Sequence, residues 1–259
     1  MTKLAANLTM LFNEHGFMDR FEAAARAGFR GVEFLFPYAF HADQIADRLN
    51  TYQLDLVLHN LPAGNWEAGE RGIACHPDRV GEFQDGVGEA IRYATALGVK
   101  QLNCLVGIRP PGVTEDDARQ TVAGNLRFAA DMLKEHKIRL LIEPINTFDI
   151  PGFYLSRTQQ AVDLIKETGS DNIYVQYDIY HMQRMEGEIA NTIKANLDII
   201  RHIQLADNPG RFEPGTGEIN YRYLFGMLDQ IGYDGWIGCE YKPRAGTVEG
   251  LGWRAAHGV

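Results

Sequence analysis

Four side chains with oxygen donors recur along the second half of the sequence at similar intervals. They are Glu143, Asp178, Gln204 and Glu240, separated by 35, 26 and 36 residues. Each lies inside or directly after an apolar run, where a carboxylate is costly unless it is paired or binds a cation. Oxygen ligands without thiolates suit a hard cation, so this set predicts a divalent metal site for Mg²⁺ or Mn²⁺.

The same residues suggest acid–base chemistry. Three carboxylates that meet at one point repel one another, and a shared proton or a divalent cation relieves that repulsion. Two glutamates on either side of a substrate, Glu143 and Glu240, could then move a proton between adjacent carbons. The alternative is that all four are ordinary strand-end residues, solvated or ion-paired. The regular spacing favours a common site, because one strand–helix unit takes about 30 residues.

Eight apolar runs typical of β-strands alternate with amphipathic segments. The predicted strands are Leu4–Met10, Gly31–Phe36, Asp55–Leu61, Gln101–Val106, Arg139–Ile145, Ile173–Tyr177, His202–Ala206 and Trp236–Tyr241. The predicted helices include Phe17–Ala27, Arg79–Leu97, Ala118–His136, Arg157–Glu167 and Tyr221–Ile231. Gly28, Gly98 and Gly232 stand where three of these helices should end. We therefore predict an α/β fold, one (β/α)8 TIM barrel over residues 1–259.

The rival fold is an open, doubly wound parallel sheet. It would favour a glycine-rich phosphate-binding turn after the first strand, and the segment Leu11–Gly16 has no such pattern. The barrel places active sites at the carboxyl ends of its strands. The four oxygen donors are therefore expected to converge at that end.

The histidines near these strand ends differ in their expected roles. His181 follows Asp178 by three residues and shares the predicted rim, so we expect it to contact substrate. His59 ends the third strand and is a second candidate for substrate binding, against an ordinary structural role. His202 precedes Gln204 by two residues and lies deeper in its strand, so a core position is expected.

Two cations are candidates for binding a substrate anion. Arg211 lies in the loop 207–218, rich in glycine and proline, where substrate contacts commonly gather. Lys242 stands two residues after Glu240 and is expected to share its strand face, which makes it the second candidate. An arginine can hold a carboxylate through two parallel hydrogen bonds.

Composition limits the class of protein. The 259 residues are 45% hydrophobic and 23% charged, and the net charge of −9 disfavours a nucleic-acid partner. No apolar run is long enough to span a membrane, and the N-terminal residues do not resemble a signal peptide. Cys75, Cys104 and Cys239 are few and widely spaced, which predicts free thiols in the cytosol. A small-molecule substrate is expected, and a homo-oligomer is left open.

Recognisable segments span nearly the whole chain. They are ANLTMLF (6–12), GVEFLFPY (31–38), HNLPAG (59–64), GERGIA (69–74), EPIN (143–146), YDIYHMQ (177–183), EPGTGEINY (213–221) and GCEYKP (238–243). Together they resemble the hydroxypyruvate isomerase family of the xylose isomerase-like TIM barrels. The resemblance implies interconversion of hydroxypyruvate and tartronate semialdehyde, with Glu143 and Glu240 as proton donor and acceptor. It also implies metal binding by those glutamates with Asp178 and Gln204.

Several alternatives stay open. Sugar epimerases of this superfamily usually have histidine at the position of Gln204, so the metal requirement is not settled by the resemblance. A related family acts on 2-oxo-tetronates, which are one carbon longer. A ketose 3-epimerase would use the same two glutamates, and a metal-dependent endonuclease would need more histidine ligands and a basic groove. The non-enzyme alternative is a barrel that binds a small molecule without catalysis.

Overall fold

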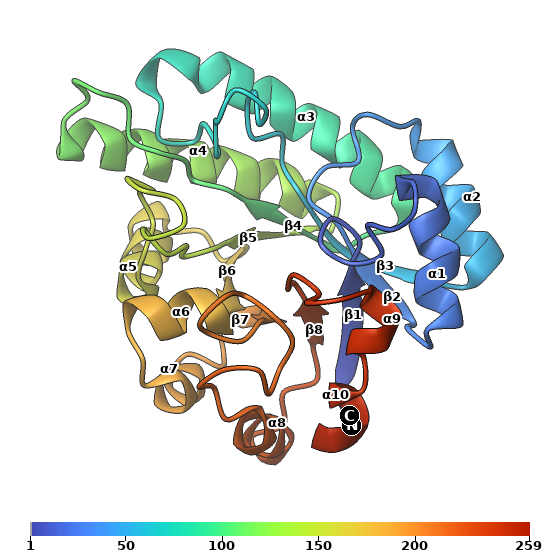
Figure 1. The fold of residues 1–259 in the computed structure, drawn as a ribbon. Helices are drawn as coiled ribbons and strands as arrows, with labels where there is room; N and C mark the ends of the chain where they lie inside the picture. Colours follow the sequence, from blue (N-terminus) through green and yellow to red (C-terminus); the bar gives the residue numbers. More distant parts are fainter. Residues whose placement is uncertain (1) are drawn as a thin grey trace.

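Eight parallel strands close into a barrel in sequence order (Figure 1). The structure is a computed structural model that describes residues 2–259. The closed barrel confirms the predicted fold and rules out the open sheet. The strands are β1 (Lys3–Asn7), β2 (Gly31–Glu33), β3 (Asp55–Asn60), β4 (Gln101–Cys104), β5 (Arg139–Ile142), β6 (Ile173–Asp178), β7 (Ile200–Leu205) and β8 (Trp236–Cys239).

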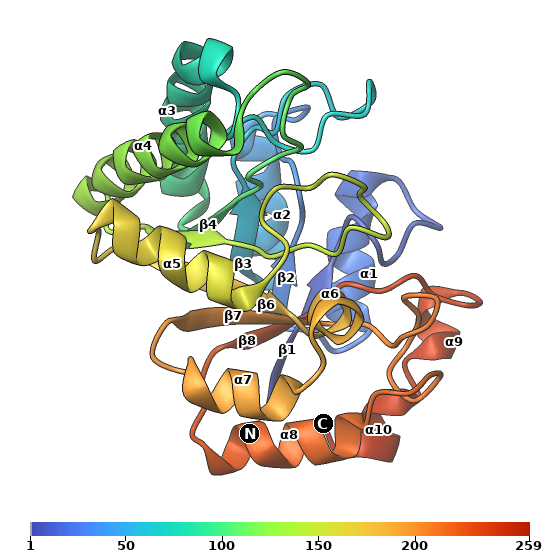
Figure 2. The same cartoon turned by 90° about the vertical axis from the view of Figure 1, so that its left-hand side faces the viewer.

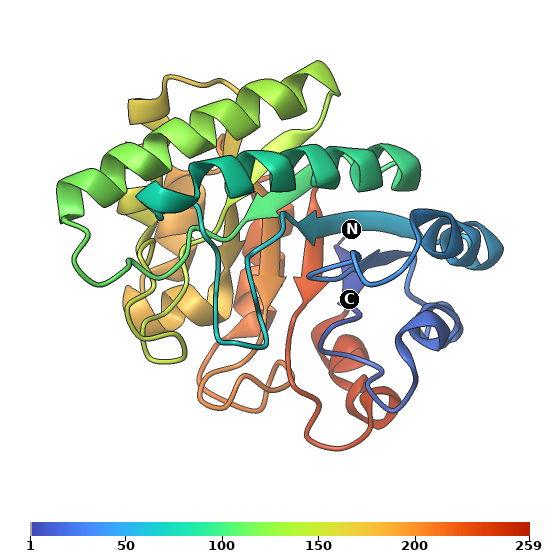
Figure 3. The same ribbon diagram turned by 90° about the horizontal axis from the view of Figure 1, so that it is seen from above.

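Helices cover the outside of the barrel, and α3 and α4 lie side by side beside β4 and β5 (Figure 3). The helices are α1 (Arg20–Arg26), α2 (Ala42–Tyr52), α3 (Val80–Leu97), α4 (Glu115–Glu135), α5 (Thr158–Thr168), α6 (Ile179–Met185), α7 (Ile189–Ala195), α8 (Tyr221–Gln230), α9 (Thr247–Gly250) and α10 (Trp253–His257). Two 3-10 turns, η1 (Phe17–Asp19) and η2 (Pro77–Arg79), precede α1 and α3. The five predicted helices match α1, α3, α4, α5 and α8 within a few residues.

Local sequence explains where these helices begin and end. Thr114 accepts a hydrogen bond from the backbone N–H of Asp117 at 3.1 Å and so caps the N-terminus of α4. Gly98 follows α3 with φ of 72°, the left-handed conformation that glycine adopts without a steric penalty. Gly28 and Gly232 follow α1 and α8 with φ of 84° and 75°. The three glycines therefore end helices as predicted.

The barrel contains two separate apolar clusters. The larger cluster fills the space between the strands and the surrounding helices. The smaller one consists of Ala5, Val57, Leu58 and Leu141, with the partly buried Trp236 packed against it. These residues come from four different strands and close the interior of the barrel. This packing leaves the carboxyl ends of the strands for polar side chains.

Long loops follow β1, β5 and β7 and gather on one side of the molecule, the right-hand side of Figure 2. This is the end at which TIM barrels bind their substrates. The three cysteines are free, as predicted, and all three are buried. Among residues 2–259, no helix is both long enough and apolar enough to cross a membrane.

Candidate active site

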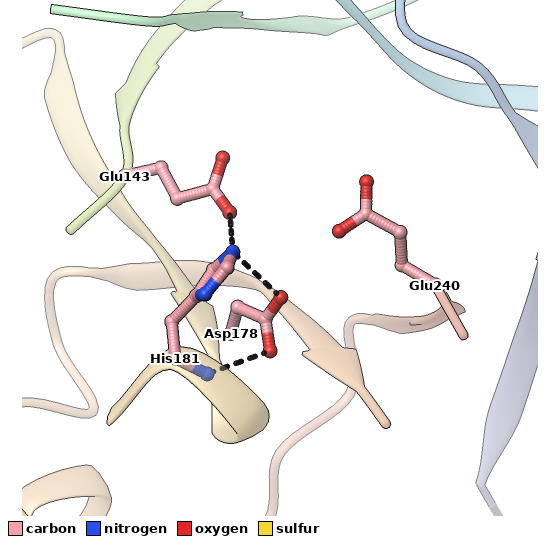
Figure 4. Close-up of side chains that lie close together, drawn as sticks. All are labelled: Glu143, Asp178, His181 and Glu240. Carbon is pink, nitrogen blue, oxygen red and sulfur yellow. Dashed lines mark hydrogen bonds and ion pairs between the residues drawn. The ribbon is translucent and has the colours of Figure 1, made fainter. Parts of the chain in front are cut away.

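Four titratable side chains meet at the carboxyl end of the barrel (Figure 4). Glu143 follows β5, Asp178 ends β6, Glu240 follows β8, and His181 lies in the first turn of α6. All four are buried, and each offers a ligand atom within 4.8 Å of the others. The structure therefore brings together three of the four predicted oxygen donors and the predicted rim histidine.

Asp178 is held in place because it caps α6. Its Oδ1 accepts hydrogen bonds from the backbone N–H of Tyr180 at 2.8 Å and of His181 at 3.4 Å. The N-terminal N–H groups of a helix lack partners within the helix, so this cap satisfies two of them. Its other oxygen, Oδ2, lies 3.5 Å from Nη2 of Arg211 and faces the site. The direct passage from β6 into α6 thus fixes one carboxylate of the cluster.

The two glutamates have perturbed pKa values. Burial, reinforced by the charges of Glu240 and Asp178, holds the pKa of Glu143 well above its usual value. Burial also raises the pKa of Glu240 to about 8, although the neighbouring Arg211 acts in the opposite direction. Asn103 Nδ2 donates to Oε2 of Glu143 at 2.9 Å and orients it. Carboxyl groups that titrate near neutral pH can accept or donate a proton there, as general acid–base catalysis requires.

The raised pKa of Glu240 has a consequence for stability that can be measured. In the unfolded chain this carboxyl has its ordinary pKa near 4.5, whereas in the metal-free fold it is about 8. Between these values only the folded state holds the proton, so the free energy of unfolding should fall as pH rises. The slope per group is about 1.4 kcal/mol per pH unit, and the contribution is complete below pH 4.5 and lost above about 8.

Urea unfolding in EDTA from pH 5 to 9 measures this slope. Glu240→Gln cannot ionise and should show a shallower decline. Mg²⁺ or Mn²⁺ should stabilise the wild type more at pH 8 than at pH 6, because at pH 8 fewer protons compete for the ligands. Equal slopes in wild type and variant would contradict the titration of Glu240 in this range.

A cavity of about 240 Å³ opens beside the cluster. Glu143, Glu240, Gln204, His181 and Arg211 all contribute to its wall. The other polar residues of the wall are Asn7, Thr9, Glu33, Asn60 and Gln176, and its apolar residues are Met10, Phe34, Leu35, Leu58, Trp66, Leu105, Ile145 and Ile150. A space of this size, with many convergent polar groups and an apolar remainder, suits a small polar molecule.

His59 does not reach this cavity. Val32 of β2 pairs with Leu56, but the next residue of β2 pairs with Leu58, so β3 has an extra residue at Val57. Val57 and Leu58 therefore both belong to the cluster inside the barrel, and the usual alternation of side chains is shifted. Leu58 and Asn60 line the cavity, whereas His59 is fully buried, with a pKa lowered to about 4 by burial.

Lys242 also lies outside the cavity. The expectation that it shares a face with Glu240 assumed a strand that continues past this glutamate. The structure ends β8 at Cys239, so the alternation does not extend to Lys242. The Lys242 side chain is exposed, and its backbone N–H donates to the carbonyl of Arg211 at 2.7 Å. Of the two predicted cations, only Arg211 faces the cluster, where it pairs with Glu240.

Gln204 lines the cavity, and its side-chain amide is oriented by hydrogen bonds to two other residues of the barrel interior. Its Nε2 donates to Oε1 of Glu33 at 2.7 Å, and its Oε1 accepts from Nε2 of Gln176 at 2.7 Å. Glu33 is completely buried and also accepts from Nδ2 of Asn7 at 2.9 Å. His202 Nε2 lies 2.6 Å from the other oxygen of Glu33, in the core position expected for this histidine.

Sequence reasoning did not assign a role to Glu33, although an acid in the apolar strand Gly31–Phe36 was a visible signal. The barrel makes room for it at one point of β8. A Cβ atom on Gly238 would lie 2.4 Å from both carboxylate oxygens of Glu33, so a side chain at this position would displace the carboxylate. Glycine at position 238 therefore lets Glu33 reach Gln204 and His202 across the interior.

The family model for the xylose isomerase-like TIM barrel matches residues 21–257. The chain belongs to this family. It is 57% identical to a hydroxypyruvate isomerase from Escherichia coli over 253 residues, which cover 98% of each chain. It is 47% identical to a 2-oxo-tetronate isomerase from Cupriavidus necator over 253 residues, covering 98% of this chain and 97% of the relative.

Among solved structures, a protein from Brucella melitensis named as an AP endonuclease of family 2 has the same fold. Its TM-score is 0.96 at 46% identity, with 99% of each chain covered. The resemblance to hydroxypyruvate isomerases is therefore confirmed along the whole barrel, and the chain is an isomerase of this family.

Proposed function

We propose that this barrel interconverts hydroxypyruvate and tartronate semialdehyde by moving a proton between two adjacent carbons. The observation that carries the proposal is the pair of buried glutamates, Glu143 and Glu240, which face one small cavity with raised pKa values. The relative at 57% identity is named for this activity. Because burial raises the pKa of both carboxyls, one can be protonated and act as acid while the other is ionised and acts as base.

The proton balance follows from this assignment. The ionised glutamate removes a proton from C3 of hydroxypyruvate, the C–H electron pair forms the C2–C3 double bond, and the C2 oxygen takes a proton from solvent. The resulting enediol then receives a proton at C2 from the second glutamate, while the C3 hydroxyl returns a proton to solvent and becomes the aldehyde. The two glutamates finish with exchanged protonation states and regain their starting states by proton exchange with solvent. No electron acceptor is required, because C2 is reduced as C3 is oxidised.

Two further side chains are assigned to the substrate. Arg211 lines the cavity, and its Nε is buried without a hydrogen-bond partner among residues 2–259. A buried guanidinium donor without a partner favours an incoming carboxylate, which it can bind through two hydrogen bonds. His181 lines the same cavity and is placed to donate to a substrate oxygen.

The donor set also fits a hard divalent cation. We assign Glu143, Asp178 and Glu240 as its carboxylate ligands, with Gln204 as the predicted fourth, and propose Mg²⁺ or Mn²⁺. Such a cation, when bound, polarises the substrate oxygens and stabilises negative charge on the enediolate. Arg211 lies against Asp178 and Glu240 and so supplies positive charge to the same carboxylates.

A four-carbon 2-oxo-tetronate is the second candidate substrate, because a relative at 47% identity is named for it. An endonuclease is disfavoured by the net charge of −9, since binding to nucleic acid depends on clustered cations. We place the enzyme in the cytosol because its three cysteines are free and buried.

Solvent-deuterium exchange tests the proposal. Hydroxypyruvate, a 2-oxo-tetronate and a ketohexose are incubated separately with the enzyme in D₂O, with and without EDTA, and the products are identified by NMR. We expect deuterium at C3 of recovered hydroxypyruvate and in the tartronate semialdehyde formed, at a rate lowered by EDTA. Exchange only into the tetronate would assign the longer substrate. Bound ligand without exchange in any of the three would instead indicate a non-catalytic binding barrel.

A further inference from the structure

The side-chain amide of Asn146, in the loop after β5, uses all of its hydrogen-bonding capacity. Its Oδ1 accepts from the backbone N–H of Phe148 at 3.1 Å and of Asp149 at 2.8 Å. Its Nδ2 donates to Oδ2 of Asp149 at 3.1 Å and lies 2.6 Å from Nδ1 of His181. An amide has two donor hydrogens and two acceptor lone pairs, and each of the four has one partner here.

The orientation of this amide follows from its neighbours. If oxygen and nitrogen were exchanged, the NH₂ group would face the two backbone N–H donors of Phe148 and Asp149. The oxygen would in turn face the carboxylate of Asp149. Three hydrogen bonds would become contacts between two donors or two acceptors, so only the observed orientation is compatible with the loop. The group that points at His181 is therefore an N–H donor.

A ring nitrogen that accepts this N–H cannot carry its own proton. We propose that Asn146 is a positioning residue that holds His181 as the neutral tautomer protonated on Nε2, so that Nε2–H donates into the active site. The two nearest groups on that side are acceptors: Nε2 lies 3.5 Å from Oδ2 of Asp178 and 3.9 Å from Oε1 of Glu143. Both edges of the imidazole ring then face complementary partners.

The surroundings support a neutral ring. His181 is 2% exposed, and a charged ring would need a proton on Nδ1, where the N–H of Asn146 already points. Asp149, which fixes the second N–H of Asn146, is itself held by the hydroxyl of Tyr180 at 2.9 Å and by an ion pair with Arg184. The tautomer is thus determined by a chain of fixed partners that starts outside the cavity.

The tautomer decides what His181 can do. A protonated Nε2 has no lone pair for a metal, so His181 is excluded as a ligand although it lies within the cluster of four. The cation site is then made of oxygen ligands. Nε2–H is free to donate to a substrate oxygen as charge develops there, which is the most effective place for a fixed donor. This catalytic consequence rests on the proposed isomerase function, whereas the tautomer does not.

Asn146→Asp is the variant that reverses the tautomer. A carboxylate of the same shape still accepts from the two backbone N–H groups of the loop, but it can only accept from the ring and should draw the proton to Nδ1. ¹⁵N-histidine NMR of the full-length protein reads both nitrogens directly. We expect protonated Nε2 in the wild type and protonated Nδ1 in the variant. Wild-type Nδ1 protonation, or no change in the variant, would overturn the proposal without any assay of activity.

Kinetics supply the second readout. With Nε2 unprotonated, kcat for hydroxypyruvate should fall about a hundredfold, the scale of one lost donor at a developing oxyanion, while KM changes less than about threefold. In a His181→Gln background, Asn146→Asp should lower kcat much less than it does in the wild type, because the imidazole ring through which Asn146 acts is absent. Equal losses in both backgrounds would assign Asn146 a structural role only.

A charge-matched control separates the tautomer from electrostatics. Asn146→Asp places a carboxylate beside Asp149, and the double variant Asn146→Asp/Asp149→Asn keeps the total charge of the pair. We expect the double variant to retain the reversed tautomer and the low kcat. Recovery of kcat with the tautomer still reversed would show that repulsion, and not the proton position, caused the loss.

Discussion

Glu143→Gln and Glu240→Gln are each expected to lower the turnover of hydroxypyruvate by at least about a hundredfold, the usual scale for loss of a general acid or base. Glutamine keeps the shape of the side chain but cannot accept or deliver the proton. Burial already favours the neutral form of both carboxyls, and glutamine is neutral, so neither variant should unfold the protein. Loss of turnover in a folded variant would therefore report chemistry.

Exchange in D₂O distinguishes the roles of the two glutamates. The variant without the base that acts at C3 should lose both isomerisation and exchange into recovered hydroxypyruvate. The other variant should still exchange the C3 proton but fail to complete the product. Glu213→Gln is a matched control, because Glu213 is also buried after β7 but lies outside the cavity wall and accepts from the backbone of Arg244. A rate near that of wild type in either test variant would remove that glutamate from the mechanism.

The position of the acid cluster could be predicted from sequence for a simple physical reason. A carboxylate in an apolar strand is costly, so Glu143, Asp178 and Glu240 stood out, and the length of a strand–helix unit implied that they meet. The barrel also followed from repetition, because eight alternating units of this size have few ways to bury their apolar faces. Both inferences depend on averages over many residues and tolerate errors at single positions.

The failures concern the direction of single side chains. The extra residue at Val57 reverses which residues of β3 face inward, and it carries no recognisable sequence signal. His59 was therefore assigned to the cavity, while Asn60 lines it. Similarly, the end of β8 at Cys239 decides that Lys242 faces solvent. The ends and bulges of a strand depend on how it pairs with the neighbouring strands. The residue pattern within the strand itself carries no information on that pairing.

Glu33 illustrates a second limit. Its burial depends on Gly238, a residue more than 200 positions away, and on donors from Asn7, His202 and Gln204. Gln204 stood out as a candidate ligand, but nothing in the sequence connects it, Asn7, His202 or Gly238 with Glu33. Only the closed barrel brings them to one point, where the carboxylate orients the amide of Gln204. Networks across a barrel interior are properties of the three-dimensional arrangement and not of local sequence.

Arg211→Met is expected to lower kcat/KM for hydroxypyruvate at least about a hundredfold, mainly through KM. Two hydrogen bonds to a charged group contribute about 3–6 kcal/mol after exchange with water is counted, so their loss should be large. The substitution also removes the cation that lowers the pKa of Glu240, so that pKa should rise above about 8. The acidic limb of the profile of kcat/KM against pH should accordingly move to higher pH, because more of the base is protonated.

Hydroxyacetone, in which a methyl group replaces the carboxylate, separates the two effects. Wild type should exchange the protons of hydroxypyruvate far faster than those of hydroxyacetone, and Arg211→Met should lose most of this preference. Arg211→Lys keeps the charge but not the paired donors. The acidic limb of its profile of kcat/KM against pH should therefore lie where it does in the wild type, while its KM for hydroxypyruvate should be raised. Arg244→Met is the control, since Arg244 is an exposed arginine outside the cavity wall. An unchanged preference in Arg211→Met would show that another group binds the substrate carboxylate.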